Sequence, residues 1–234
     1  MSKLPLVGLV DYGSGNLRSV QRAIEHAGAE CIHVLSEADT TGCAALVVPG
    51  VGSFGDCARQ LREAGLWDVI KEWIAADKPY LGICLGYQLL FDSSEESPGV
   101  NGFGALRGKV IHFSKTSGLK IPHMGWNQLH VHNPSDRLMK GLGENPDFYF
   151  VHSYYPVPED EQVITSTCDY DGEFAASVTK GNLSAVQFHP EKSQALGLEM
   201  LRNFISSLRY NTRFHYLFFI LHFYFYQHAP LSRN

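Results

Sequence analysis

The sequence predicts an α/β fold built on an open mixed sheet, parallel in its N-terminal half with helices on both faces, and antiparallel in its second half. Two patterns predict this fold class. Within the first 93 residues, short runs rich in β-branched residues alternate with helical patterns, which is typical of β-α-β units. Further along, short strands follow one another directly and are separated by Gly, Pro, Asn and Asp, which favours antiparallel pairing.

Each element of the first half is bounded by residues that break regular structure. Leu6–Asp11 is a buried strand, and the helix Asn16–Ala27 has apolar residues at helical spacing and ends at Gly28. Further strands are expected at Cys31–Leu35, Ala45–Val48 and Tyr80–Ile83, and further helices from Ser53 or Asp56 to Ala64, at Leu66–Ala76 and at Leu85–Asp92. Open α/β sheets bind ligands at the carboxyl ends of their strands, so a site is expected there.

The second half consists of short strands and a final helix. Gln194–Leu208 presents Leu198, Leu201 and Ile205 at helical spacing, so this helix is expected to pack against the core. The strands are expected at Lys109–Phe113, Gln128–Val131, Phe148–Val151, Val163–Thr167, Phe174–Val178 and Ser184–Phe188.

Composition excludes several classes of function. The net charge of −5 provides no basic footprint for nucleic acid. Five cysteines without a C-x-x-C pair argue against a disulfide framework or a zinc site and favour reduced thiols in a cytoplasm. The N-terminus lacks a signal-peptide pattern, and the apolar run Phe214–Tyr226 is shorter than the roughly 20 residues that cross a bilayer. We therefore expect a cytoplasmic protein with no nucleic-acid partner and no membrane segment. We also expect no cofactor.

Histidine spacing does not predict a metal site. His130 and His132 lie two residues apart in an expected strand, without an acidic third ligand nearby. We interpret them as the polar face of that strand and expect no bound metal.

Cys84 lies between a strand and a helix and is flanked by glycines in the segment Gly82-Ile83-Cys84-Leu85-Gly86. A nucleophile on such an elbow occupies a strained turn, and the glycines let the neighbouring backbone pass close to it. The dipole of the following helix favours the thiolate, and the amide of Leu85 is placed to donate to an oxyanion. The cysteines at positions 31, 43, 57 and 168 have no comparable setting and are expected to be structural.

A thiolate nucleophile needs an imidazole that exchanges protons with the substrate and a carboxylate that orients the imidazole. His189 follows an apolar strand, which Pro190 ends. Glu191 is separated from His189 by one residue, so in an extended segment both side chains leave the chain on the same side. The pair therefore suits a general base and the carboxylate that orients it.

The two motifs, which lie about 105 residues apart, resemble those of the class I (triad) glutamine amidotransferases, which release ammonia from glutamine for a synthase partner. Within this family, further segments resemble the glutaminase subunits of imidazole glycerol phosphate synthase, in histidine biosynthesis. These segments are Asp11–Leu17, Pro49–Asp56, Pro122–Asn127 and Lys192-Ser193. The resemblance covers about residues 4–208 and implies a class I glutamine amidotransferase-like fold.

The resemblance implies a role for each member of the triad. Cys84 attacks the carboxamide of L-glutamine and forms a γ-glutamyl thioester while ammonia departs. His189 transfers protons, and Glu191 holds its tautomer. The oxyanion hole is expected to be formed by Val51, Gly52 and Leu85. Glycines on both sides of Val51 permit a peptide flip that points its amide at the developing charge.

The resemblance also implies a substrate pocket and a docking face. Gln88, one helical turn after Cys84, is placed to hydrogen-bond the amino-acid end of glutamine. The rest of the pocket is expected to comprise Gly50, Gly52, Ser153 and Tyr154. The docking face is expected to comprise Asn16, His123, Met124, Trp126, Asn127, Tyr149 and Lys192.

By the same resemblance the partner is the cyclase subunit of imidazole glycerol phosphate synthase, a (β/α)8 barrel in a heterodimer. It would use the ammonia to form imidazole glycerol phosphate and aminoimidazole carboxamide ribotide. A barrel alone needs about 200 to 250 residues, so this chain is too short to include one.

Two alternatives remain for the function. The first is the glutaminase subunit of another amidotransferase, which the Pro122–Asn127 and Glu191-Lys192-Ser193 patterns disfavour. The second is a non-catalytic binding module on the same fold, which is disfavoured because all three triad residues are present.

Residues 209–234 differ in kind from the rest of the chain. Nine of the 28 aromatic residues lie at positions 210–234, which include no Asp or Glu. Arg213 and Arg233 give these positions a charge of +2, so residues 1–209 carry −7. We expect residues 1–208 to form the glutamine amidotransferase domain and residues 209–234 to be an atypical aromatic-rich tail. An altered reading frame or read-through is our leading explanation for the tail, and a docking or membrane-surface segment is the alternative.

Deletion of residues 210–234 should leave catalysis intact, because this segment has no counterpart in the family pattern and includes none of the expected site residues. Glutamate release from glutamine, measured with the cyclase subunit present, compares the truncated and full-length chains. A truncated chain that is soluble and inactive would contradict the expected domain boundary.

Overall fold

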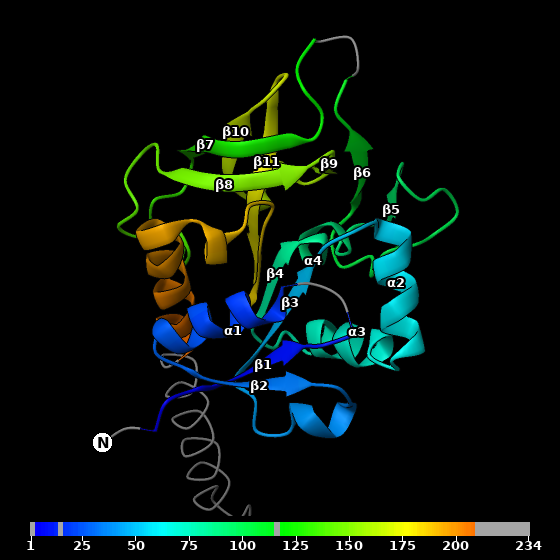
Figure 1. The fold of residues 1–234 in the computed structure, drawn as a ribbon, viewed down its shortest axis with the longest axis vertical. Coiled ribbons are helices and arrows are strands. Elements are labelled where there is room, and N and C mark those ends of the chain that lie inside the picture. Colours follow the sequence, from blue (N-terminus) through cyan, green and yellow to red (C-terminus); the bar gives the residue numbers. More distant parts are fainter. Residues whose placement is uncertain (1–2, 14–15, 115–117, 209–234) are drawn as a thin grey trace, which may run out of the picture.

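The computed structural model describes residues 3–13, 16–114 and 118–208, and the tail expected at residues 209–234 lies outside them. In these residues, nine strands form one large mixed sheet and three form a small sheet (Figure 1). In spatial order the large sheet comprises β2 (Glu30–Val34), β1 (Leu6–Val10), β3 (Ala45–Gly50), β4 (Tyr80–Cys84), β12 (Leu183–Val186), β11 (Glu173–Lys180), β10 (Ile164–Asp169), β7 (His123–Val131) and β8 (Asp147–His152). The small sheet comprises β5 (Ser93–Ser94), β6 (Gly108–His112) and β9 (Tyr154–Pro158).

Helices lie on both faces of the large sheet, as the sequence predicts (Figure 1). They are α1 (Leu17–His26), α2 (Phe54–Glu63), α3 (Trp67–Ala75), the four-residue α4 (Leu85–Gln88) and a helix over residues 194–208. Short 3-10 turns are η1 (Glu37–Thr40), η2 (Glu161–Val163) and η3 (Pro190–Lys192). No helix within the described ranges combines the length and apolar character that a membrane crossing requires.

The two faces of the sheet bury separate apolar clusters. On one face, Ile24 of α1 and Phe204 of the 194–208 helix pack with strand residues such as Val47. On the other face, Leu61 of α2 and Ile70 of α3 pack with strand residues such as Leu46. Because β1, β3 and β4 are buried from both sides, their sequences are almost continuously apolar.

Strand directions agree with the predicted fold class and add one detail. β1 pairs in parallel with β2 and β3, and β3 pairs in parallel with β4. In the second half β7 pairs antiparallel with β8 and β10, and β10 with β11. β12 is antiparallel to β11 but parallel to β4. A tight turn at residues 181–182 reverses the chain after β11, so β12 runs beside β4 in the same direction.

The helix predicted at Leu85–Asp92 is wrong beyond Gln88. The carbonyl of Leu89 accepts a hydrogen bond from the amide of Phe103 (2.6 Å), and that of Leu90 accepts one from the amide of Leu106 (3.0 Å). These carbonyls therefore bond to a later segment of the chain instead of continuing the helix.

Three features of the second half were not predicted at their observed extent. β5 has two residues, which is too short to leave a pattern, and β9 includes Pro156 and Pro158, which disfavour a strand in sequence. β7 begins at His123, five residues before its predicted start. The prediction began too late because Gly125 interrupts the sequence pattern of a strand.

One edge of the large sheet is suited to hold a functional site. β3, β4 and β12 are adjacent and parallel, so their carboxyl ends lie at the same edge of the sheet. The backbone amide of His189, just after β12, donates to the carbonyl of Tyr149 (2.9 Å), which fixes β8 beside this edge. Figure 1 shows α4 and β8 near it.

Gly86→Ala should destabilise the protein strongly, because a Cβ at this position would lie 1.8 Å from the carbonyl oxygen of Val48. We expect a loss of about 3 kcal/mol in the free energy of unfolding, measured by urea denaturation. Gly143→Ala is the matched control: its φ of +87° strains alanine, but nothing lies within 4 Å of the new Cβ. Its expected loss is about 1 kcal/mol, and equal losses in the two variants would contradict the close contact at Gly86.

Candidate active site

Cys84 ends β4 in a strained backbone conformation. Its φ of +55° and ψ of −107° lie outside the regions that non-glycine residues usually occupy. The flanking glycines are required by space, since a Cβ at Gly82 would lie 2.6 Å from the carbonyl oxygen of Gly86. The structure therefore confirms the predicted strained turn. Because α4 has only four residues, the predicted contribution of its dipole to the thiolate is small.

His189 and Glu191 form a buried pair. Nδ1 of His189 lies 2.8 Å from Oε1 of Glu191, and both side chains are 3% exposed. The segment between them is not extended as predicted, because Pro190–Lys192 forms η3, but the two side chains still meet. Among the described residues neither Nε2 of His189 nor Oε2 of Glu191 has a hydrogen-bond partner. Because Nδ1 faces Glu191, Nε2 is the ring nitrogen left to interact with the neighbouring Cys84.

The protonation state of His189 depends on its neighbours. Burial opposes the charged imidazolium, but the nearby sulfur of Cys84 and the carboxylate of Glu191 outweigh it and raise the pKa of His189 to about 10. At neutral pH the imidazole of His189 is therefore protonated.

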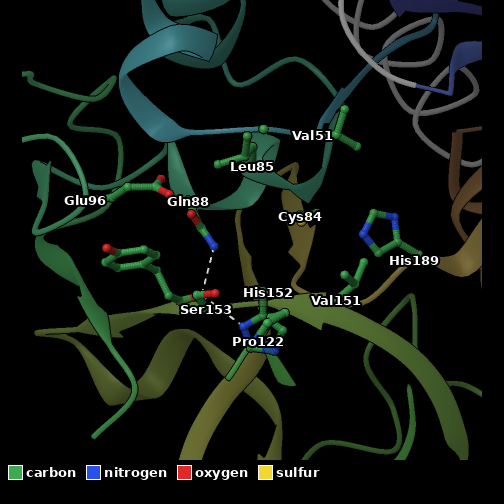
Figure 2. Close-up of a pocket in the computed structure, with 12 residues that line it drawn as sticks. Val51, Cys84, Leu85, Gln88, Glu96, Pro122, Val151, His152, Ser153 and His189 are labelled. Carbon is green, nitrogen blue, oxygen red and sulfur yellow. Dashed lines mark hydrogen bonds between the residues drawn. The ribbon is translucent and has the colours of Figure 1, made fainter. Parts of the chain in front are cut away.

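Cys84 and His189 line the same cavity of about 380 Å3, a volume in the usual range for small-ligand sites (Figure 2). Further lining residues are Val51, Gly52, Leu85, Gln88, Glu96, Pro122, Val151, His152, Ser153 and Tyr154. The structure thus brings together most residues that the sequence predicts for the oxyanion hole and the substrate pocket. Gly50 is a correction: it packs against Leu85 and Tyr12 and does not line the cavity.

Two residues at this site were missed by the sequence analysis. Glu96 lines the cavity and accepts a hydrogen bond from the amide of Phe54 at the start of α2 (2.6 Å). Burial raises the pKa of Glu96. Gln187 is fully buried, and its Nε2 lies 3.7 Å from Sγ of Cys84. Its position two residues before His189 was the available signal, but a polar residue in a strand does not by itself indicate a contact.

The expected oxyanion residues lie on two segments around Cys84. Leu85 is buried directly after Cys84, whereas Val51 is 42% exposed and follows the carboxyl end of β3. Gly52 has a φ of +100°, a conformation that suits glycine. Figure 2 shows Leu85 and Val51 on the same side of the cavity, opposite Ser153.

Part of the expected docking face is an exposed cluster on β7, β8 and η3. Met124 and Trp126 are 61% and 49% exposed, and Trp126 is paired in register with Tyr149. The rings of Trp126 and Tyr149 lie 6.1 Å apart, and Nζ of Lys192 lies 5.8 Å from the centre of the Tyr149 ring. Asn16 is exposed at the start of α1, away from this cluster in sequence.

Within the expected docking face His123 is a correction because its side chain is buried, whereas Asn127 is partly exposed and stays a prediction. They alternate with Met124 and Trp126 along β7, so their side chains leave the opposite face of the strand. His123 is 3% exposed and stacks on Tyr170 at 4.0 Å between ring centres. Asn127 donates a hydrogen bond to the carbonyl of Asp169 (2.9 Å).

Two buried histidines connect β7 to the cavity. Nδ1 of His152 donates to the carbonyl of Tyr154 (2.9 Å), since a carbonyl only accepts. Nε2 of His152 therefore accepts from Nδ1 of His123 (3.0 Å). Burial lowers the pKa of His123 to about 4 and, together with nearby His123 and His189, that of His152 to about 3. Both rings are neutral at physiological pH.

The described residues include no cluster of three or more His, Cys, Asp or Glu side chains that could hold a metal ion. Of the histidine pair noted in sequence, His132 contacts the hydroxyl of Thr167 through Nε2 (2.8 Å).

Comparison with known proteins assigns the family. Residues 8–208 match the model of glutamine amidotransferase class-I. The chain belongs to the class-I glutamine amidotransferase family. It is 46% identical over 203 residues to the imidazole glycerol phosphate synthase subunit HisH of Rhodopirellula baltica, which covers 86% of this chain and 98% of that protein.

Two further comparisons extend this result. The chain is 44% identical to the chloroplastic imidazole glycerol phosphate synthase hisHF of Arabidopsis thaliana, over 86% of this chain and 34% of that longer protein. A chain in the solved structure of PurLQS from Thermotoga maritima superposes with a TM-score of 0.69 at 23% identity, over 89% of this chain and 99% of that one. The second likeness supports the α/β fold.

Because His123 and His152 are neutral in the folded protein, we expect the protein to lose stability in mild acid. The unfolded chain binds protons on His123 and His152 near their ordinary pKa of 6.5, whereas the folded protein does so near 4 and 3. The free energy of unfolding should therefore fall as the pH decreases from about 6.5 to about 4.

His152→Gln should make this fall smaller, because an amide does not titrate. The measurement is the urea midpoint at pH 7 and pH 5 for wild type, His152→Gln and the exposed control His130→Gln. An unchanged difference in His152→Gln would contradict the burial of a neutral His152.

Proposed function

We propose that this chain is the glutaminase subunit of imidazole glycerol phosphate synthase. It hydrolyses L-glutamine to glutamate and ammonia and delivers the ammonia to a cyclase subunit in histidine biosynthesis. The observation that carries the proposal is the strained Cys84 in a cavity that it shares with the buried pair of His189 and Glu191. The name of the bacterial relative, imidazole glycerol phosphate synthase subunit HisH, and its 46% identity support this branch of the family.

The proposed reaction begins with the thiolate of Cys84, which attacks the carboxamide carbon of glutamine and moves an electron pair onto the carbonyl oxygen. Protonated His189 gives its proton to the amide nitrogen, the carbon–nitrogen bond breaks, and ammonia leaves a thioester on Sγ. Neutral His189 then takes a proton from the water that attacks the thioester, which releases glutamate and restores the thiolate. Glu191 holds the imidazole through Nδ1 in both steps.

The developing oxyanion is proposed to accept hydrogen bonds from the amides of Leu85 and Val51. Each well-aligned donor contributes about 3 kcal/mol to stabilisation of the transition state. The glycines beside Val51 let its peptide turn toward the oxyanion. The exposure of Val51 supports dependence of that movement on a bound partner.

The amino-acid end of glutamine is proposed to lie between Gln88 and Glu96. The carboxylate of Glu96 suits the α-ammonium group, and it lines the cavity. Nε2 of Gln88 already donates to the carbonyl of Tyr154 (2.9 Å) and to Oε1 of Gln187 (3.1 Å). The atom of Gln88 that would bind substrate is therefore its Oε1.

The cyclase partner is proposed to be a (β/α)8 barrel that docks on Met124, Trp126, Tyr149 and Lys192 and forms a heterodimer. An exposed apolar cluster with a cation at its edge is typical of an interaction surface. Val151 lies next to this cluster in register with Met124 and also lines the cavity, so the docked surface would adjoin the site where ammonia forms. The longer Arabidopsis protein, named hisHF, is consistent with a second subunit.

The proposed reaction uses no cofactor or metal, and we place it in the cytoplasm because all five cysteines are unpaired. A glutaminase subunit of a different synthase would need another docking surface. A non-catalytic binding module would not need a strained cysteine beside a charged imidazole. Neither alternative has an observation of its own in its favour.

Cys84→Ala should abolish glutamine-dependent synthesis of imidazole glycerol phosphate by the complex and leave ammonia-dependent synthesis intact. The reason is that the thioester cannot form, whereas the cyclase uses ammonia from solution. The measurement is product formation by the assembled complex with either nitrogen source.

Cys43→Ala is the control for loss of a thiol, since Cys43 lies outside the cavity and should leave both activities unchanged. Loss of both activities in an assembled Cys84→Ala complex would contradict the division of labour between the subunits.

A further inference from the structure

Gln187 is a buried polar side chain that the reaction described above does not use. It is 0% exposed, and it follows the last paired residue of β12. Val186 is in register with Ile83, so the next residue on each strand, Gln187 and Cys84, lie side by side. Nε2 of Gln187 lies 3.7 Å from Sγ of Cys84, within hydrogen-bond distance for sulfur.

The orientation of this amide follows from its neighbours. The carbonyl of Tyr154 only accepts, so Gln88 must turn its Nε2 toward it. Nε2 of Gln88 only donates, so the atom of Gln187 that faces it must be Oε1. Gln187 is thereby held with its Nε2 toward Cys84.

We propose that Gln187 is a further catalytic residue, which donates a hydrogen bond to the sulfur of Cys84 and stabilises the thiolate, and that Gln88 positions it. A neutral donor favours a thiolate over a thiol because the charged sulfur is the stronger acceptor. The same bond stabilises the sulfur when it leaves the thioester during hydrolysis. Stabilisation of the leaving sulfur rests on the proposed function, whereas the hydrogen bond to the thiolate does not.

Other titratable groups lie around Cys84 and set the background for a test. His189 and Glu191 face it from the segment after β12, His152 faces the same cavity from β8, and Glu96 lines it from the loop after β5. Cys57 of α2 interacts electrostatically with Cys84. A change at Gln187 leaves each of these groups in place.

A labelling experiment must separate Cys84 from the other four thiols. Burial raises the pKa of Cys31, Cys57 and Cys168 to about 12, and burial also raises that of Cys43. The label that iodoacetamide leaves on Cys84 is measured by mass spectrometry of the peptide that includes this residue, and Cys84→Ala identifies that peptide.

The test is the rate of alkylation against pH in Gln187→Met, which keeps the length of the side chain and removes the donor. We expect the midpoint of the curve to move about one pH unit upward and the rate at pH 7 to fall about tenfold. Gln88→Met should move the midpoint in the same direction by less, because the amide of Gln187 is then free to turn. Ser184→Ala, which removes a buried hydroxyl from the same strand, should leave the curve unchanged.

An unchanged curve in folded Gln187→Met would overturn the proposal. If Gln187→Met does not fold, an unchanged alkylation curve in Gln88→Met would overturn the proposal instead. Loss of glutaminase activity with an unshifted curve would assign Gln187 to substrate binding and would also overturn it. A wild-type complex that does not hydrolyse glutamine would refute the proposed function, whereas the alkylation curves would still decide the role of Gln187.

Discussion

The parallel pairing of β4 with β12 is the constraint on which the candidate site depends. Its register, from Leu183 opposite Tyr80 to Val186 opposite Ile83, places both carboxyl ends at one edge of the sheet. Gln187 and His189 therefore lie beside Cys84, although about 100 residues separate them in sequence. An antiparallel β12 would have placed the histidine at the opposite edge, where it could not reach the cysteine.

Polar side chains buried at the same edge bond to one another, apart from Nε2 of His189 and Oε2 of Glu191, which have no hydrogen-bond partner among the described residues. The turn at Cys84 leaves no room for a Cβ at Gly82 or Gly86, so the backbone beneath it is tightly packed. Buried amides and imidazoles must then find partners in one another. They do so in a continuous series from Cys84 through Gln187 and Gln88 to the carbonyl of Tyr154, which also accepts from His152.

The parts of this arrangement that sequence could predict are those encoded within a few neighbouring residues. The glycines around Cys84 and the spacing of His189 and Glu191 are local signals, as are the parallel β-α-β units of the first half. Gln187 and Glu96 could not be found in the same way, because their positions come from strand register and from a contact with the start of α2. The short length of α4 was missed for a related reason, since distant amides bind the carbonyls of Leu89 and Leu90.

The burial of His123 shows why the two sides of β7 cannot act independently. Met124 and Trp126 lie on its exposed side, whereas His123, the adjacent residue, bonds to His152 on the other side. His152 bonds to the carbonyl that also holds Gln88. A partner that displaces β7 must therefore change a hydrogen bond within this series or move the series with it. Stacking of His123 on Phe150 and Tyr170 adds apolar contacts to these hydrogen bonds, so the exposed side of β7 and the cavity share one set of buried side chains.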